Sequence, residues 1–414
     1  MRIGDFAKKY NVNVTAVRYY IENALLTPQR RNNQYIFDKK CIEDMDKIIE
    51  YKKCGLSLEE IELLFFLEKT SRFQDETIVQ IVCELFENKI SWFTEEKERI
   101  ETSLQLLQEQ LKKFESMQAT TQTTTGRGVP FSFIPSLYCP KCNVPLSMEN
   151  TKIHAGQIFE GDLCCSCGYH AKISEGVVFC DGHTEDTPFK MFNNVDSVIS
   201  ATDEYSGVYR ILLDKVSLYM YQNMPLGDFP QHVMFGPFTC NCLLRFCGNL
   251  NKNHVYIIID PSKNRIQKLR EYLAETDLQM VFMAGNIDEV PLRKESIDIY
   301  MDDYSVTNSL FTYGGFIYEQ INKLLKDTGL ILGAVGDYKD APKSAENIRK
   351  DHPTYPIDKL SPQQFAANMK FHGFEVQEMK AIGCTHGNEM HFPRNEVGEQ
   401  VTMLGYTAVK KKSK

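Results

Sequence analysis

Four cysteines in two close pairs constrain this chain of 414 residues more than any other feature of its sequence. Cys139 and Cys142 enclose two residues, Cys164 and Cys167 enclose two residues, and 21 residues separate the pairs. Two such turns can close a tetrahedron of thiolates around Zn²⁺, so we expect a structural zinc site at these four cysteines, with Cys165 pointing away from it. Because four thiolates leave no open coordination position, the site is expected to stabilise the fold rather than to catalyse. A redox-active dithiol is the alternative for this pattern.

The remaining composition indicates a reducing compartment. Thirteen cysteines are an odd number, and the polar N-terminus MRIGDFAKKYNVNV has no apolar signal core. We therefore expect a cytoplasmic protein with thiols and metal ligands instead of a disulfide framework. No apolar run approaches the ~18 to 20 residues that a membrane span needs, so no membrane partner is expected.

The net charge of −8 hides an uneven distribution. Residues 1–53 carry 11 Lys and Arg against 7 Asp and Glu, whereas residues 54–116 carry 7 against 14. A basic head before an acidic stretch is typical of a local phosphate-binding surface on an acidic molecule, although ordinary surface charge gives the same counts.

The basic head has the pattern of two short helices and a hairpin. Residues 3–10 and 14–23 predict the helices, with a turn at 11–13 between them. On the second helix Val14, Val17 and Ile21 share the inner face, which leaves Thr15, Arg18 and Tyr19 or Tyr20 to point outward, where they could enter a major groove. Residues 29–37 predict a tight hairpin that presents Arg30 and Arg31 to a nucleic-acid backbone.

This stretch, followed by YKKCGLSLEEIELLF, resembles the MerR family of transcription regulators across roughly residues 1–70. VRYY, LLTP, a short basic wing with a tyrosine, and GLSLEEI occur in the family's order and spacing. The wing is shorter than the common pattern and lacks its usual glycine. The resemblance implies DNA contacts from Arg18, Tyr19, Tyr20, Arg30, Arg31 and Tyr35.

A long helix is expected after the head. Residues 75–115 contain no Gly or Pro. The apolar residues that step by four and three along it are Ile100, Leu104, Leu107, Leu111 and Phe114. Such a seam needs a partner, which is either this chain's own head domain or a second copy. MerR relatives use this helix for an antiparallel coil, which implies a homodimer on a pseudo-palindromic duplex operator.

From Met224 onward, strands alternate with helices. Strands are predicted at 254–260, 280–284, 298–301 and 329–335, and helices at 263–273 and 316–325. This order predicts a doubly wound α/β sheet with its ligand site at the carboxyl ends of the strands. Asp260 ends the first of these strands, where a carboxylate can bind a ribose diol.

This half resembles class I S-adenosylmethionine-dependent methyltransferases over about residues 224–410, on the segments IIIDPSKNRIQKLRE and GNIDEVPLRKESIDI. The resemblance implies Asp260 for the ribose and Asn286, Ile287 and Asp288 for the adenine edge. With CPKCNVPL, residues 137–410 also resemble, more loosely, the large-subunit rRNA guanine methyltransferases, whose zinc module opens with CPxCxxPL. Asp302, Asp303 and Tyr304 follow the third of the predicted strands. Methyltransferases often place substrate or catalytic residues at this position, so Asp302 is predicted either to line a pocket or to cap the end of the strand.

The first-strand loop departs from the methyltransferase pattern. In the methyltransferase pattern the first strand ends in a loop with several glycines, and in HVMFGPFTC only Gly236 remains. Pro237 lacks an N–H, and Phe238 and Thr239 add bulk where the backbone should approach the cofactor. The pocket is expected either to hold S-adenosylmethionine or a related ligand in an altered way, or to sense something else. No catalytic residue is predicted.

Other cysteines offer a weaker metal pattern. Cys240, Cys242 and Cys247 could bind a soft metal, but their apolar neighbours favour buried thiols.

The predicted organisation has five parts. They are a winged helix-turn-helix at 1–74, a dimerisation helix at 75–117, a linker at 118–136, a zinc module at 137–182 and a methyltransferase-like domain at 183–414. The predicted function is that of a dimeric DNA-binding transcription regulator whose effector domain binds S-adenosylmethionine or another small ligand without normal catalysis. It would act on RNA polymerase indirectly, by distorting operator DNA. The alternative is an active methyltransferase for RNA or a small molecule with a DNA-binding head.

Overall fold

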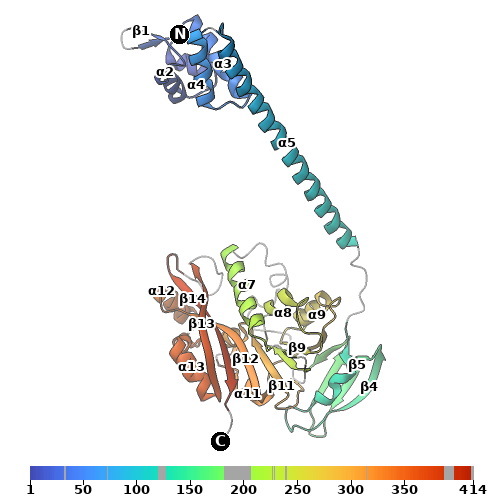
Figure 1. Ribbon diagram of the computed structural model, residues 1–414. Helices are drawn as coiled ribbons and strands as arrows, with labels where there is room; N and C mark the ends of the chain where they lie inside the picture. The colour runs from blue at the N-terminus through green and yellow to red at the C-terminus, as the bar shows by residue number, and fades with distance from the viewer. Residues whose placement is uncertain are drawn as a thin grey trace. The chain divides into compact units, whose positions relative to one another are not determined.

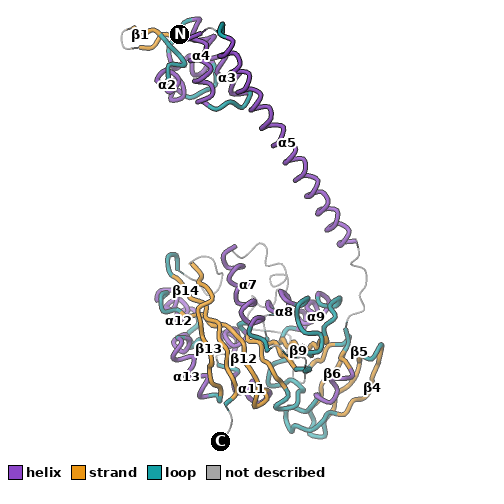
Figure 2. Tube along the Cα trace, viewed as in Figure 1, coloured by secondary structure: helices purple, strands orange, loops and turns teal. Residues whose placement is uncertain are grey.

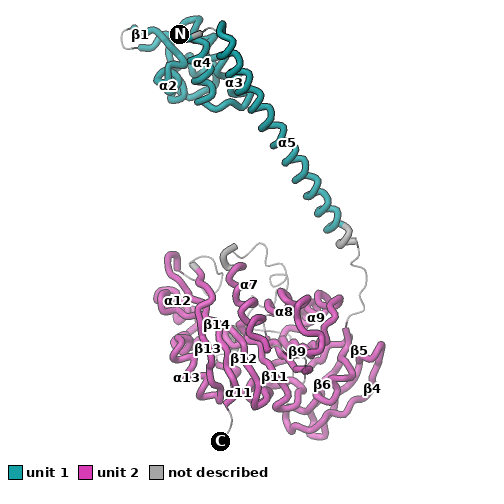
Figure 3. The backbone as a smooth tube through the Cα atoms, viewed as in Figure 1, with its two compact units in different colours: residues 1–122 teal, residues 123–414 magenta. Residues whose placement is uncertain are grey.

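The protein consists of two compact units, residues 1–122 and 123–414, each of which is described by itself (Figure 3). The computed structural model describes residues 1–31, 34–71, 73–119, 127–180, 207–225, 227, 229–237, 240–313, 315–386 and 396–411. No helix in these ranges is both long and apolar enough to cross a membrane.

The first unit is helical, with one small hairpin (Figure 1). Its elements are α1 (Ile3–Lys9), α2 (Val14–Glu22), β1 (Gln29–Arg31), β2 (Gln34–Ile36), α3 (Lys39–Lys53), α4 (Leu58–Ser71) and α5 (Glu76–Ala119). Two short helices, a basic hairpin and a long helix occur as the sequence predicts, and the helices α3 and α4 lie between the hairpin and the long helix. The tip of the hairpin, residues 32 and 33, lies outside the described residues.

Side-chain caps start three helices of this unit, α2, α3 and α4. Before α3, the Cys41 amide donates a hydrogen bond to Asp38 Oδ1 at 3.0 Å. The Ala16 amide donates a hydrogen bond to Asn13 Oδ1 at 2.6 Å, which fixes the start of α2 after the turn. Before α4, the Glu60 amide donates to Ser57 Oγ at 3.1 Å and the Ser57 amide donates to Glu60 Oε2 at 2.6 Å. The helices then bury one core, whose members include Phe6, Val17, Leu25, Met45, Ile48, Ile61 and Leu64.

α5 exposes an apolar stripe along its second half. The five seam residues are between 51% and 66% exposed: Ile100, Leu104, Leu107, Leu111 and Phe114. The described residues of the first unit leave this stripe uncovered. The described residues of the head domain therefore do not supply the partner that the seam needs.

The second unit is built on one mixed sheet, drawn in orange in Figure 2. In chain order the strands are β3 (Val129–Pro130), β4 (Ser147–His154), β5 (Gln157–Cys164), β6 (His170–Ser174), β7 (Val177–Phe179), β8 (His232–Phe235), β9 (Val255–Asp260), β10 (Gln279–Ala284), β11 (Ile297–Asp302), β12 (Leu325–Asp337), β13 (Phe374–His386) and β14 (Gln400–Lys410). Across the sheet the order is β13-β14-β12-β11-β8-β9-β10-β7-β6-β5-β3, and β4 pairs with β5.

Helices connect these strands and cover the sheet (Figure 1). They are α7 (Gly207–Gln222), α8 (Asn241–Phe246), α9 (Lys263–Tyr272), α10 (Ser305–Tyr313), α11 (Tyr318–Leu324), α12 (Pro342–Asp351) and α13 (Pro362–Phe371), with short 3₁₀ turns η1 (Phe131–Ser136) and η3 (Ile357–Leu360). One layer of apolar side chains lies on each face of the sheet, so the strands in its middle are buried on both sides.

The middle of the sheet is parallel and doubly wound. β10, β9, β8, β11 and β12 are parallel neighbours in this order, which is the order 3-2-1-4-5 of a Rossmann-like sheet. The chain runs outward from β8 to β10 and then returns to the other side of β8, where β11 lies. Ligands of such sheets bind at the carboxyl ends of the strands at this switch point. The predicted fold class, a helix-turn-helix with a long helix followed by a doubly wound domain, is confirmed.

The cysteine segment, residues 127–180, belongs to this sheet. β7 lies parallel to β10, and β6, β5 and β3 continue the sheet antiparallel. Arg127 Nε donates to the Ala274 carbonyl at 3.1 Å, and Val129 is fully buried. Residues 127–136, which the sequence suggested as linker, are therefore part of the second unit.

The connection from β10 to β11 contains no helix. Parallel strands need a crossover, and this is usually a helix that covers one face of the sheet. The crossover loop, residues 285–296, has turns and a single β-bridge instead. Its residues Ile287, Val290 and Leu292 pack in one core with apolar side chains of the cysteine segment. The cysteine segment therefore covers the sheet face that a crossover helix would cover.

Gly285 tests how tightly the cysteine segment packs against the sheet. A Cβ at Gly285 would lie 2.6 Å from both Cβ and Sγ of Cys180, so we expect Gly285→Ala to lower the free energy of unfolding by about 1 to 3 kcal/mol. Gly248→Ala is the control, because nothing lies within 4 Å of a Cβ there, and we expect a change below about 0.5 kcal/mol. Urea denaturation of the full chain measures both, and equal effects would contradict the close packing.

Candidate functional site

The exposed residues of α2 and β1 form the candidate nucleic-acid interface of the first unit. The predicted contacts that are exposed are Thr15, Arg18, Tyr19, Arg30 and Arg31. Tyr19 is 41% exposed, and its hydroxyl donates to Glu62 Oε1 at 3.4 Å. Cations on a recognition helix and on a neighbouring hairpin can meet phosphates on both sides of one groove.

Two predicted tyrosine contacts lie elsewhere. Tyr20 is only 3% exposed and packs in the core with Val17, which lies three residues earlier on the same helix face. Of Tyr19 and Tyr20, which the residue pattern left as alternatives, Tyr19 is the outward one, and the DNA contact that the resemblance implied for Tyr20 is corrected because the helical period that exposes Tyr19 turns Tyr20 inward. Tyr35 is half-buried on β2, and the Arg30 guanidinium lies 5.8 Å from its ring centroid. Tyr35 thus orients a predicted phosphate contact through a cation–π interaction.

Four thiol groups gather in the cysteine segment. The Sγ atoms of Cys139, Cys142, Cys165 and Cys167 all lie within 4.8 Å of one another. Sγ of Cys139 lies 3.4 Å from that of Cys167, and Sγ of Cys142 lies 3.4 Å from that of Cys165. Four thiolates bound tetrahedrally to Zn²⁺ are about 3.8 Å apart, as follows from a Zn–S distance of ~2.3 Å. The geometry of this four-cysteine group therefore fits a tetrahedral metal ion.

The fourth member of the four-cysteine group is Cys165, which corrects the predicted Cys164. Cys164 ends β5 and pairs with Ser147 and His170. Side chains alternate between the faces of a strand, so Cys165 continues the face of Leu163, which is buried in the same core as Cys139. Cys164 points to the other face. Gly168, directly after the last ligand, has a φ of 89°, a left-handed conformation that favours glycine.

The predicted ribose-binding acid at the end of β9 has partners within the chain. The Ser262 amide donates to Asp260 Oδ1 at 2.7 Å, and Arg265 Nε lies 3.5 Å from Asp260 Oδ2. The side chains of Asp260 and Arg265 are 3% and 1% exposed. A ribose that bound this carboxylate would compete with a buried guanidinium, whose charge needs compensation.

The residues predicted to meet adenine lie in the crossover loop. Asn286 donates from its amide and from Nδ2 to Glu289 Oε2, at 3.1 and 3.2 Å. Ile287 is buried and Asp288 is exposed. Asn286 and Ile287 therefore hold the loop in place, and Asp288 is the member of the three that faces solvent.

The remaining glycine of the first-strand loop lies close to α10. A Cβ at Gly236 would lie 2.2 Å from Ser305 Oγ and 2.3 Å from Tyr300 Oη. The Gly236 amide donates to the Met301 carbonyl at 3.2 Å, which joins the end of β8 to β11 at the switch point. Phe238 and Thr239, the bulky residues of this loop, lie outside the described residues.

Asp302 caps the helix that follows its strand. Its Oδ1 accepts hydrogen bonds from Ser305 Oγ at 2.8 Å and the Val306 amide at 2.7 Å, and its Oδ2 accepts from the Tyr406 hydroxyl at 2.5 Å. The carboxyl is fully engaged in joining β11, α10 and β14. Of the two roles considered for this position, these bonds support the strand cap.

Asp303 is a candidate that the predicted ligand set omits. Its Oδ2 accepts from the Cys242 amide at 3.0 Å, whereas Oδ1 is buried without a hydrogen-bond partner in the described structure. Burial raises the pKa of Asp303 to about 6. The sequence Asp-Asp-Tyr marks the place, but the pattern alone does not distinguish the capping acid from its neighbour.

Of the three cysteines in the weaker pattern, Cys240 and Cys242 are buried and Cys247 is half-buried. Cys240 and Cys242 are at most 3% exposed, and burial raises the pKa of both thiols. Cys242 Sγ lies 3.5 Å from the Ser217 carbonyl, to which it donates. Within the described ranges, the four-cysteine group is the one set of side chains with metal-ligand geometry.

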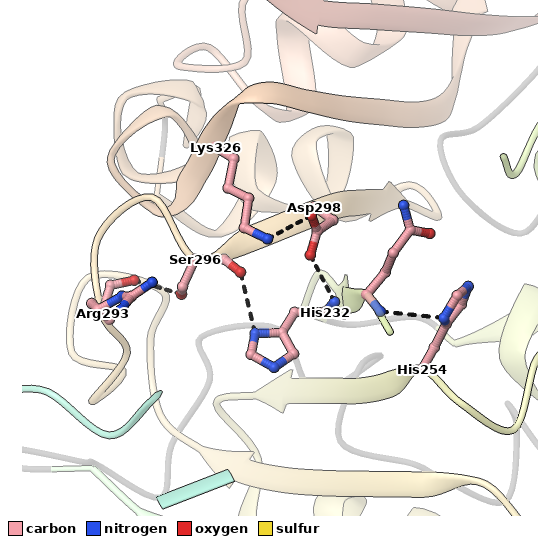
Figure 4. A network of polar contacts seen from close by, with 7 residues as sticks. His232, His254, Arg293, Ser296, Asp298 and Lys326 are labelled. Carbon is pink, nitrogen blue, oxygen red and sulfur yellow. Dashed lines mark hydrogen bonds and ion pairs between the residues drawn. The ribbon is translucent and has the colours of Figure 1, made fainter. Parts of the chain in front are cut away.

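A polar network joins the opposite, amino ends of the strands (Figure 4). The His232 amide donates to Asp298 Oδ2 at 2.9 Å, and Lys326 Nζ donates to Asp298 Oδ1 at 2.7 Å. His232 Nδ1 lies 3.2 Å from the Ser296 carbonyl, and burial lowers the pKa of His232. These contacts bind β8, β11 and β12 together at the edge away from the predicted ligand site.

Comparison with known families finds a match for part of the first unit. Residues 1–65 match the model of the MerR HTH family regulatory proteins and are a MerR-type helix-turn-helix domain. No curated protein sequence matches the chain.

Solved structures resemble each half of the chain. A MerR-family transcriptional regulator from Bacillus cereus is 25% identical and covers 30% of this chain and 87% of its own, with a TM-score of 0.24. An S-adenosylmethionine-dependent methyltransferase from Thermotoga maritima is 15% identical and covers 53% of this chain and 100% of its own, with a TM-score of 0.35. A 1,6-didemethyltoxoflavin N1-methyltransferase from Burkholderia thailandensis is 14% identical and covers 53% and 85%, with a TM-score of 0.31.

Replacement of single cysteines tests the metal ligands. We expect Cys165→Ser to lose a zinc ligand and to weaken zinc binding by at least about 100-fold, because a hydroxyl replaces a thiolate. The matched control is Cys164→Ser, which changes the adjacent residue on the other face of the strand and should retain one zinc per chain. Zinc content by mass spectrometry, after dialysis against chelators of increasing strength, measures both variants. If Cys164→Ser lost zinc more readily than Cys165→Ser, Cys164 would be the fourth ligand, as the sequence predicted.

Proposed function

We propose that the protein is a dimeric, DNA-binding transcription regulator with a C-terminal effector domain for a small ligand. The observation that carries the proposal is the MerR-type domain at residues 1–65, whose recognition helix α2 exposes Thr15, Arg18 and Tyr19. The cations of β1 add contacts that position the domain on DNA without reading its sequence. We also propose a cytoplasmic location, because the thirteen cysteines form no disulfide and four of them have metal-ligand geometry.

A homodimer explains the apolar stripe on α5. Five half-exposed seam residues on one helix favour a second helix with the same pattern. Two copies joined in this way would present two recognition helices to two half-sites, so the operator would be pseudo-palindromic. A ligand would change transcription only if it bound two forms of the dimer with different affinities, and RNA polymerase would respond to the resulting distortion of the operator.

The effector domain is proposed to bind S-adenosylmethionine or a related ligand in an altered way, without normal methyl transfer. Its support is a doubly wound sheet whose switch point is intact, combined with predicted cofactor-binding groups that have partners within the chain. Asp260 is paired with Arg265, and Asp302 caps α10. The four-cysteine group would hold a structural zinc ion, which in a closed site supplies folding energy rather than catalysis.

Removal of the Arg18 side chain tests DNA recognition. Selection of binding sites from random duplexes with the full chain should yield a pseudo-palindrome whose affinity falls with rising salt. Arg18→Ala should weaken that affinity by roughly 10- to 100-fold, because a contact to a base or a phosphate is lost. Arg99→Ala is the control, because Arg99 is an exposed arginine on α5 that pairs with Glu96 on the same helix. If no sequence-selective binding is found, the regulator proposal fails.

Calorimetry tests the effector domain. Titration of the full chain with S-adenosylmethionine and S-adenosylhomocysteine should give saturable binding, and chromatography of the mixture should show no methylated product with RNA or small-molecule acceptors. Turnover would support the alternative, an active methyltransferase with a DNA-binding head. The Asp260→Asn variant is expected to lose at least about tenfold in affinity if the ribose is bound at this strand end.

A further inference from the structure

The crossover loop is hydrogen bonded to the first turn of the four-cysteine group. The amide of Tyr138, which directly precedes Cys139, donates to the Pro291 carbonyl at 3.1 Å. The Lys294 amide donates to the side-chain oxygen Oδ1 of Asn143, the residue after Cys142, at 3.3 Å. Residues on either side of this cysteine pair therefore hold the second half of the loop.

The loop is also bonded to the second turn of the group. The Cys165 amide donates to the Tyr169 carbonyl at 3.0 Å, which closes this turn. The hydroxyl of Tyr169, a side chain only 2% exposed, donates to the Glu289 carbonyl at 2.8 Å. Glu289 Oε2 in turn accepts both hydrogen bonds of Asn286. A continuous series of contacts thus leads from the second cysteine turn to the start of the loop.

The far end of the loop is fixed independently of the cysteines. Ser296 Oγ donates to the Arg293 carbonyl at 2.6 Å, and the Ser296 carbonyl lies against His232 in the network of Figure 4. Between this anchor and β10 the loop contains no helix, so its backbone has few hydrogen bonds of its own. Residues 286–294 are held by the two cysteine turns and, just before the first turn, by a hydrogen bond from the Arg293 amide to the Ser136 carbonyl at 3.0 Å and by the β-bridge between Leu137 and Leu292.

We propose that the four-cysteine group, with its metal bound, positions the crossover loop, and that Tyr169 and Asn143 are the positioning residues. A metal ion fixes the distance between the two turns, and each turn holds one part of the loop through one of these side chains. Loss of the metal frees the turns from each other and weakens the hydrogen bonds through which Tyr169 and Asn143 hold residues 286–294, although Ile287, Val290 and Leu292 stay buried in the core. Where it concerns ligand binding by these residues, the inference rests on the proposed function. In that case the bound metal would change the affinity for the ligand, and the bound ligand would change the affinity for the metal by the same factor.

Hydrogen exchange of the full chain, loaded with Zn²⁺ or stripped by a chelator, tests the inference. Stripping should speed amide exchange in residues 286–294 by at least about tenfold and leave β8 and β9 protected. Unchanged exchange in the loop overturns the inference. So does an equal loss of protection throughout the sheet, because the metal would then serve global folding alone. Failure of the chain to bind Zn²⁺ overturns it as well.

Tyr169→Phe separates positioning from general stability, since it removes one hydroxyl and keeps the buried ring. With Zn²⁺ bound at unchanged stoichiometry, exchange around Glu289 should already be fast, and stripping the metal should add little. Tyr138→Phe is the matched control, because Tyr138 contacts the loop through its backbone amide, and its metal dependence should equal that of the wild type. A Tyr169→Phe variant with wild-type exchange would overturn the assignment of Tyr169. Neither readout requires DNA or S-adenosylmethionine, so they remain valid if the proposed function fails.

Discussion

The second unit depends on burial of the sheet face beside the crossover loop. A parallel sheet must be covered on both faces, and the helix that normally covers this one is missing between β10 and β11. Apolar residues of the cysteine segment fill that place and share one core with Ile257, Ile259 and Val281 of the central strands. The four-cysteine group lies in this cover, so a metal ion there would act on the core of the α/β sheet itself.

The cysteine segment and the strand ends that carry the predicted ligand site belong to one sheet. The edge of the sheet that carries Asp260 and Asp302 is stabilised by contacts within the chain, and the loop after β10 takes its position from the cysteine turns. A small ligand that contacted this loop would be coupled to the metal, and each would change the affinity of the chain for the other.

The sequence predicted the elements better than the neighbours of individual side chains. Helical period located α2, and the apolar run before Asp260 located β9, because both signals are local. Cys164 was misplaced because one residue decides the face of a strand, and the pairing that sets that face comes from distant segments. Tyr20 lies three residues after Val17, so the helical period by itself places Tyr20 on the inner face. The Asp260–Arg265 pair could not be predicted, because the sequence does not show which side chain of a helix points into the core. The place of the cysteine segment in the sheet could not be predicted either, because it depends on the pairing of β7 with β10.

The pairing of β7 with β10 also sets the smallest piece of the chain that can be expressed in isolation. A fragment that begins at α7 would contain every strand of the doubly wound sheet. In this fragment β10 would become an edge strand, with unpaired backbone amide and carbonyl groups on one side. β10 reads Gln-Met-Val-Phe-Met-Ala and has no charged residue to discourage association with other chains. Such a fragment would tend to aggregate through this edge, so the cysteine segment also keeps the α/β sheet from polymerising.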